Sequence, residues 1–208
     1  MIKYGLISET DARTLEKTMD LICDDFFDEG IRICEVGVYG GDTAGGINKY
    51  MAWEKHRTHF ITGIDNNKDG EINRFGYYKF IEGNSNEVYN QLEDESQHLI
   101  FIDGLHTFAG VISDFFCYAP KVKVGGFLAF HDTGKHIDPL SGWQGVGDKN
   151  DPDMCLGGVG KAISAIGLPR KDWLSKIVEI DRTDWQLIFD EADETNEAGG
   201  ICVFKKLN

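Results

Sequence analysis

Two short segments of the sequence place carboxylates and histidines next to each other. They are Asp103-Gly-Leu-His106 and His131-Asp132. An imidazole can accept a proton near neutral pH, so His106 is the first candidate for a general base and His131 the second. The same four side chains could instead surround a metal ion, as in a metal-dependent hydrolase. Both interpretations require the two segments to meet in the folded chain.

A glycine-rich segment has the pattern of a strand, a tight turn and the start of a helix. It reads Ile31-Arg-Ile-Cys-Glu-Val-Gly-Val-Tyr-Gly-Gly-Asp-Thr43. Its β-branched residues suit a buried parallel strand, its glycines allow a sharp bend, and Thr43 or Asp42 is expected to cap the helix. Backbone N–H groups at such a turn can bind a ligand. Because Tyr39 stands where a dinucleotide-binding turn has its second glycine, the turn does not fit that class.

Apolar runs that suit strands alternate with segments of helical spacing along the chain. Strands are expected at 31–36, 59–65, 79–82, 99–102 and 124–130, and helices at 8–28, from 43 towards 56, around 88–92 and at 108–118. Beyond them, a helix is expected at 159–166 and strands at 173–180, 185–189 and 201–204. The alternation predicts an α/β protein with a doubly wound, Rossmann-like, mostly parallel sheet. We expect one domain over residues 1–208, opening with a helix within residues 1–29.

A polar or glycine-rich cluster follows each of the first five expected strands. The clusters are Glu35 to Thr43, Asp65-Asn-Asn67, Gly83-Asn-Ser85, Asp103 to His106, and His131-Asp-Thr133. One such cluster would be an ordinary turn. The carboxyl ends of parallel strands lie along one edge of a sheet, so five clusters together favour a single binding crevice.

The composition narrows the class of partner and the compartment. The 208 residues include 21 Lys and Arg against 35 Asp and Glu, giving a net charge of −14 at pH 7, which argues against nucleic acid. Five scattered cysteines indicate reduced thiols and a cytoplasmic protein. We expect no signal peptide and no membrane span, because no apolar run approaches ~18 residues. The sequence leaves the oligomeric state open, and a homo-oligomer is compatible with it.

Four segments in combination resemble a known family. They are Glu35-x-Gly-x-x-Gly-Gly-x-Thr43, Ile64-Asp65, Phe101-Ile-Asp-Gly-Leu-His-Thr-Phe108 and Gly125-Gly-Phe-Leu-Ala-Phe-His-Asp-Thr133. Over roughly residues 30–135 the chain resembles class I S-adenosylmethionine-dependent methyltransferases, in their small-molecule O-methyltransferase branch. The resemblance implies a closing antiparallel strand pair, although the partner of 201–204 in that pair stays open.

The resemblance also implies a set of cofactor-binding residues. It puts Glu35, Gly37 and Gly40 around the methionine portion and Asp65 on the ribose hydroxyls, where a carboxylate can accept two hydrogen bonds from a diol. Asn84 and Ser85 would lie by the adenine, or would simply cap a helix. Thr43 and Asp103 complete the set of cofactor-binding residues that we expect.

In part of this branch a divalent cation binds the acids that follow strands four and five. Asp103 and Asp132 match those acids, whereas His131 stands where the family usually has another acid. The set Asp103, His131 and Asp132 suits Mn²⁺, Fe²⁺ or Zn²⁺ at least as well as Mg²⁺, so a metal requirement stays open.

The leading hypothesis is a methyltransferase that acts on a hydroxyl group of a small acceptor such as a sugar or a secondary metabolite. His106 or His131 would remove the proton of that hydroxyl. A metal-dependent hydrolase and a non-catalytic nucleotide-binding module are the alternatives. Residues 133–158 are expected to form a loop on the acceptor side, mobile without substrate, in which Trp143 offers an aromatic surface.

Overall fold

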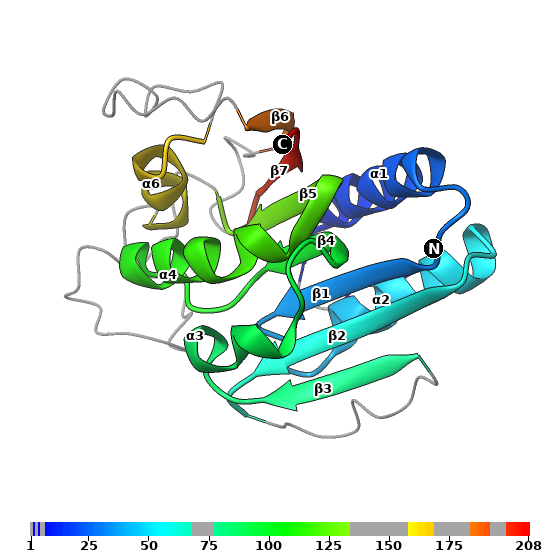
Figure 1. Cartoon of the computed structure of the whole chain (residues 1–208), viewed down its shortest axis with the longest axis horizontal. Helices are drawn as coiled ribbons and strands as arrows, with labels where there is room; N and C mark the ends of the chain where they lie inside the picture. The colour runs from blue at the N-terminus through cyan, green and yellow to red at the C-terminus, as the bar shows by residue number, and fades with distance from the viewer. Residues whose placement is uncertain are drawn as a thin grey trace.

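Seven strands form one sheet in the order β3-β2-β1-β4-β5-β7-β6 (Figure 1). The computed structural model describes residues 2, 4, 7–67, 77–133, 158–168, 184–191 and 199–208. The strands are β1 (Ile31–Val36), β2 (His59–Asp65), β3 (Tyr78–Glu82), β4 (Gln97–Ile102), β5 (Val122–His131), β6 (Trp185–Asp190) and β7 (Ile201–Lys206). The helices are α1 (Glu9–Asp25), α2 (Asp42–Lys49), α3 (Ser85–Val88), α4 (Phe108–Tyr118) and α6 (Gly158–Ala165).

The first five strands are parallel, and the last two are antiparallel to their neighbours. β1 pairs with both β2 and β4, β2 with β3, and β4 with β5, all in parallel. β7 then pairs antiparallel with β5 and with β6. The predicted fold class is therefore confirmed, and the open question of pairing is answered: the run at 185–190 joins β7. The strand expected at 173–180 lies outside the described residues.

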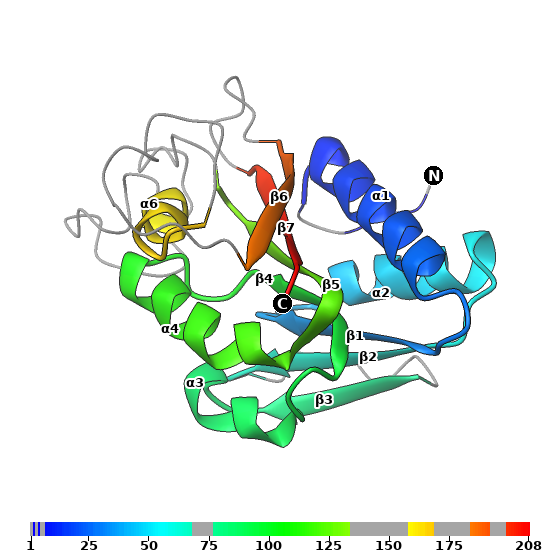
Figure 2. The same cartoon turned by 45° about the horizontal axis from the view of Figure 1, so that its top comes forward.

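Helices cover both faces of the sheet, and each face has its own apolar cluster. Figure 2 shows α1 and α2 on one side and α3, α4 and α6 on the other. Side chains of β1 alternate between the two faces, so Ile31 and Ile33 join one cluster and Cys34 and Val36 the other. This double coverage explains why the central parallel strands carry apolar residues on both faces.

Helix α1 is fixed at both ends by specific hydrogen bonds. Ser8 is its N-cap and forms a reciprocal capping box with Asp11. At the other end, the Arg57 guanidinium donates to the carbonyl oxygens of Cys23 and Phe26 at 3.1 and 2.6 Å. The helix therefore has a defined start, and that start lies beside the carboxyl end of β5, where His131 approaches Asp11.

Two expectations about helices need correction. The predicted cap of α2 by Thr43 or Asp42 was wrong, because the N-cap is Gly41, in the left-handed region at φ 78°, with no side-chain cap. The Thr43 hydroxyl instead donates to the carbonyl oxygen of Tyr4 at 3.1 Å. The helix at 88–92 is a four-residue α3 followed by a 3₁₀ turn, Tyr89–Gln91. No helix in the described part of the chain is both long and apolar enough to cross a membrane.

Candidate functional site

The carboxyl end of β1 lies between the ends of β2 and β4, and backbone hydrogen bonds hold it there. The Gly37 N–H donates to the carbonyl oxygen of Ile64 at 2.8 Å, and the Asp103 N–H donates to that of Val36 at 2.8 Å. Gly37 has φ +86°, a conformation that favours glycine. The glycine turn and the Asp103 segment are therefore joined directly at one edge of the sheet.

The Asp65 carboxylate holds the backbone of the glycine turn through hydrogen bonds. Its Oδ2 accepts the backbone N–H groups of Val38 and Tyr39 at 2.8 and 2.9 Å, and its Oδ1 accepts that of Asn67 at 3.0 Å. A carboxylate has about four acceptor positions, so these bonds leave room for roughly one more donor. The resemblance implied a ribose contact for Asp65, which stays a prediction; in the structure its carboxylate holds the backbone of the turn.

Glu35 is a buried acid with an unpaired oxygen. Its side chain is 1% exposed, and the backbone N–H of Ala44, at the start of α2, donates to it. Its Oε2 has no hydrogen-bond partner among the residues that the structure describes. Burial, together with the nearby charge of Asp103, raises the pKa of Glu35 well above its ordinary value. Buried acceptors are nearly always paired, so this oxygen marks a place where a cationic or donor group of a ligand could bind.

The other expected cofactor residues fall into two groups. The hydroxyl of Thr43 is buried on Tyr4, and that of Ser85 donates to Asp114 at 2.6 Å, so both are committed to internal bonds. The side chain of Asn84 is exposed and makes no cap bond, although the residue occupies the N-cap position of α3. The amide of Asn84 is therefore available to a ligand, whereas the hydroxyls of Thr43 and Ser85 are already hydrogen-bonded within the protein.

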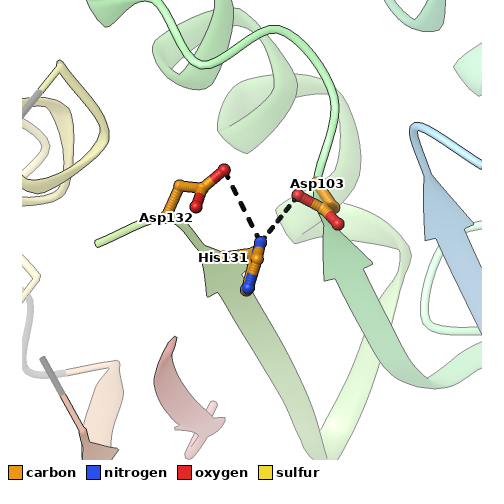
Figure 3. Close-up of side chains that lie close together, drawn as sticks. All are labelled: Asp103, His131 and Asp132. Atoms are coloured by element: carbon orange, nitrogen blue, oxygen red, sulfur yellow. Dashed lines mark hydrogen bonds and ion pairs between the residues drawn. The ribbon is translucent and has the colours of Figure 1, made fainter. Parts of the chain in front are cut away.

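The Asp103 and His131 segments meet as predicted, because β4 and β5 are neighbours in the sheet. The Oδ1 of Asp103 lies 3.2 Å from Nε2 of His106 and 3.0 Å from Nδ1 of His131. The Nδ1 of His106 lies 3.0 Å from Oδ2 of Asp132, and Figure 3 shows how Asp103 and Asp132 converge on His131. His106 thus bridges the ends of two strands.

Asp132 has an unusual backbone conformation, with φ +54°. Aspartate tolerates the left-handed region better than most residues, but it rarely occupies it without a local reason. Its carboxylate lies 3.0 Å from His106 and 3.6 Å from Nδ1 of His131. The turn after β5 therefore keeps Asp132 in contact with the cluster.

A fifth member of the cluster comes from α1 and was missed by the sequence analysis. Asp11 is 1% exposed, and its Oδ2 lies 3.3 Å from Nε2 of His131. The sequence signal was the capping-box pattern Ser8-x-x-Asp11, which predicts a helix start and says nothing about a partner 120 positions away.

The charges of the cluster reinforce each other. Burial alone would raise the pKa of Asp103, but His131 and His106 hold it at about 2. Burial alone would lower the pKa of both histidines, but the facing carboxylates raise the pKa of His106 and raise that of His131 well above its ordinary value. The carboxylates therefore favour the doubly protonated form of both imidazoles in the ligand-free protein. In this state His106 is a proton donor.

The donor set also fits a divalent cation. One ligand atom each from Asp103, His131 and Asp132 lies within 4.8 Å of the others. Among the described residues, no other set of three such side chains could hold a metal ion. Two carboxylate oxygens and one imidazole nitrogen suit Mn²⁺, Fe²⁺ or Zn²⁺ as well as Mg²⁺. The predicted metal set is therefore brought together by the fold, while the metal requirement stays a prediction.

The matched region of the chain coincides with this site. Residues 34–133 match a family model described as a methyltransferase domain. The match begins within β1 and ends just after Asp132, and so spans the carboxyl ends of all five parallel strands. Of the curated proteins compared with the chain, none matches its sequence.

Solved methyltransferase structures share the fold. An O-methyltransferase from Bacillus cereus in complex with SAH is 12% identical, with a TM-score of 0.63 over 99% of this chain and 84% of that one. CalS11, a TDP-rhamnose 3'-O-methyltransferase of calicheamicin biosynthesis, is 16% identical, with a TM-score of 0.55 over 93% and 78%. MycE of the mycinamycin pathway, with Mg, SAH and mycinamycin VI, is 19% identical, with a TM-score of 0.54 over 90% and 47%. The chain thus spans about half the length of MycE.

The domain match and the fold confirm the resemblance seen in the sequence. Residues 34–133 match a methyltransferase domain, and the chain shares the fold of an O-methyltransferase solved with SAH. At these identities the solved structures establish the fold alone.

Proposed function

We propose that this protein transfers the methyl group of S-adenosylmethionine to an oxygen atom of a small hydroxylated acceptor, such as a sugar or a secondary metabolite. The observation that carries the proposal is the position of His106, between Asp103 and Asp132 at the carboxyl edge of the sheet. The domain match supports methyl transfer, and the acceptors in the names of CalS11 and the MycE complex favour a small molecule.

The proposed cofactor site uses the glycine turn and the strand ends beside it. When bound, S-adenosylmethionine supplies an electrophilic methyl group with a good leaving group. The unpaired Oε2 of Glu35 would accept the ammonium of the methionine portion, and Asp65 would use its remaining acceptor position for the ribose. Asn84 can donate and accept at once, which suits the edge of the adenine. We retain Gly40 as the place of close approach and assign Thr43 and Ser85 to supporting positions.

The remaining task for the protein is to align the acceptor and remove its proton. His106 remains the first candidate for the base and His131 the second. Because the pKa of His106 is raised, the fraction able to accept a proton increases with pH through and above the ordinary histidine range. A divalent cation would be held by Asp103, His131 and Asp132 and would lower the pKa of an acceptor hydroxyl.

The two alternatives use less of the structure. A metal-dependent hydrolase built on Asp103, His106, His131 and Asp132 has no role for Glu35 or the glycine turn. A non-catalytic nucleotide-binding module has no role for the histidine and aspartate cluster. Methyl transfer has a role both for the glycine turn and for the histidine and aspartate cluster.

Several further expectations stay proposals. They are the single domain over 1–208, the absence of a nucleic acid partner, a homo-oligomer and a cytoplasmic location. The free thiols of Cys23, Cys34 and Cys117 fit a reducing compartment. The acceptor-side loop at 133–158 falls almost wholly outside the described residues; its first residue, Thr133, is buried beside the cluster.

Calorimetry and a transfer assay together test the proposal. S-adenosylhomocysteine should bind the purified protein with 1:1 stoichiometry, whereas NAD should not bind. Radiolabelled methyl transfer should then be measured on a panel of hydroxylated sugars and phenols, with EDTA and with Mn²⁺. The absence of S-adenosylhomocysteine binding in a folded protein would contradict the proposal, and metal-dependent hydrolysis of esters would favour the hydrolase.

A further inference from the structure

The cluster extends beyond the matched methyltransferase domain into the N-terminal helix. Asp11 lies 23 positions before residue 34, where the match starts. Its carboxylate is nevertheless within 3.3 Å of His131 at the end of β5. The side chains of both residues are buried, at 1% and 8% exposure. Burying two ionisable groups costs free energy unless each is hydrogen-bonded. The hydrogen-bond partners of Asp11 and His131 therefore show what the contact can do.

The surroundings of Asp11 fix its carboxylate on several sides. Its Oδ2 accepts the Ser8 hydroxyl at 2.6 Å and lies 3.3 Å from the Ser8 backbone nitrogen. The backbone N–H of Gly200, at the start of β7, also donates to Asp11. Asp11 therefore joins the start of α1 to β7 and β5, and it has little freedom to leave His131.

The two ring nitrogens of His131 face opposite sides. Nε2 points at Asp11, whereas Nδ1 points at Asp103, 3.0 Å away, with Asp132 at 3.6 Å. The ring also packs edge-on against Phe101, with 5.9 Å between the ring centres. A ring whose two nitrogens have different carboxylate partners has one defined orientation, and the partner of one nitrogen determines what the other can do.

We propose that Asp11 is a positioning residue of the site: it accepts the Nε2 proton of His131 and thereby directs Nδ1 towards Asp103 and Asp132. This inference rests on the proposed function only where it concerns the cation. An imidazole that donates one N–H to a carboxylate is a better ligand or acceptor at its other nitrogen, and loss of such a carboxylate typically costs 10–100-fold in metal affinity. The pair Asp11 and His131 thus presents a nitrogen backed by a negative charge.

A purely structural role for Asp11 is the competing explanation. As the third residue of the capping box, Asp11 stabilises α1 whether or not His131 is present. The two roles differ in what they affect: a cap changes stability, whereas a positioning carboxylate changes the tautomer of His131. A matched control is therefore a variant that weakens the same helix without removing a hydrogen-bond partner of His131. Leu15→Val is suitable, because Leu15 is fully buried one turn after Asp11.

The experiment compares wild type, Asp11→Asn, Asp11→Ala and Leu15→Val as full-length chains. Ring ¹⁵N spectra of histidine-labelled, metal-free protein report the His131 tautomer at a pH at which the ring is neutral, with the signal assigned by its loss in His131→Asn. Calorimetry with MnCl₂ and with S-adenosylhomocysteine gives the two affinities, and melting curves give the stability. Asp11→Asn is nearly isosteric, so it should fold even if Asp11→Ala does not.

We expect the neutral ring of wild-type His131 to carry its proton on Nε2 in a larger fraction of molecules than the ring of Asp11→Asn, in which Asp103 and Asp132 shift the proton towards Nδ1. Mn²⁺ affinity should fall 10–100-fold in Asp11→Asn, whereas S-adenosylhomocysteine affinity should change less than twofold. Leu15→Val should lower the melting temperature and leave the tautomer and the Mn²⁺ affinity unchanged.

An unchanged tautomer in both Asp11 variants, or an equal change in Leu15→Val, would overturn the positioning role. If wild type binds no Mn²⁺, the tautomer alone decides, because it is read in metal-free protein. Failure of the proposed function would appear separately, as wild type that neither binds S-adenosylhomocysteine nor transfers methyl groups.

Discussion

A Cβ atom on Gly37 would lie 2.2 Å from the carbonyl oxygen of Asp103, a separation that real Cβ atoms do not adopt. A residue with a side chain therefore does not fit at position 37, because the backbone at the end of β4 occupies that space. Gly40 is different, because a Cβ there would have no neighbour within 4 Å in the described part of the chain. Of these two predicted cofactor-binding glycines, the first packs the strand ends together and the second faces open space.

Alanine substitutions should separate these roles. Gly37→Ala combines a backbone clash with a positive φ, and should reduce the free energy of unfolding by ~2 kcal/mol or more. Gly40→Ala should retain the wild-type denaturation midpoint but weaken S-adenosylhomocysteine binding at least ~10-fold, because its methyl group fills the space that we assign to the cofactor. Urea melts and calorimetry measure both. Equal stability of the two variants would show that the contact of Gly37 with Asp103 relaxes easily.

The fold could be predicted because its signals are local. The runs that became β1, β2 and β4 are rich in apolar and β-branched residues, and α4 begins after the capping Thr107 and ends just before Pro120. The meeting of Asp103 with His131 followed from the parallel order of strands alone. These inferences required no knowledge of individual side-chain contacts.

The parts that could not be predicted depend on contacts between distant residues. Two examples are the hydrogen bond from the Thr43 hydroxyl to the carbonyl oxygen of Tyr4 and the contact of Asp11 with His131. Both depend on how distant segments pack against each other, which no local sequence pattern indicates. Asp65 shows a further limit: its position at a strand end was predicted, but a strand-end carboxylate can bind either a ligand or the adjacent backbone.

The second prediction concerns Asp65, whose carboxylate accepts two backbone N–H groups of the glycine turn. Asp65→Ala removes these acceptors, so hydrogen exchange at the amides of Val38 and Tyr39 should accelerate in the ligand-free protein. Cofactor affinity should fall as well, because the turn is less ordered before binding. Exchange measured by NMR and calorimetry test the two effects. If affinity falls while both amides keep their protection, Asp65 acts on the ribose without bracing the turn.

The third prediction concerns His106 as the base. His106→Asn removes the proton acceptor and should lower turnover by ~10² or more, while S-adenosylhomocysteine affinity stays within about twofold. The matched control is His56→Asn, since His56 is exposed, has φ 52° and lies outside the cluster, and asparagine tolerates that conformation. Single-turnover methyl transfer measures the effect. Turnover that survives in His106→Asn would assign proton removal to His131, to a cation or to solvent.

Asp114 provides the basis for a prediction about pH and stability. Its side chain is buried on α4, and the Ser85 hydroxyl donates to its Oδ1 at 2.6 Å. Burial raises the pKa of Asp114 from 3.8 to about 6, partly opposed by the bond from Ser85. Below the unfolded pKa the group is neutral in both states. As pH rises through the interval up to the folded pKa, the unfolded chain loses this proton first, so stability decreases.

Asp114→Asn keeps an acceptor for Ser85 and removes the buried charge. The variant should therefore exceed wild type in the free energy of unfolding by about 1–3 kcal/mol at pH 8, with the advantage shrinking towards zero below pH ~4. The lower end of this range applies if the new amide nitrogen finds no acceptor. Urea melts at several pH values measure the difference, and Asp28→Asn, an exposed acid just after α1, serves as the control. A gain that is the same at pH 4 and pH 8 would show that packing, and not the buried charge, distinguishes the variant from wild type.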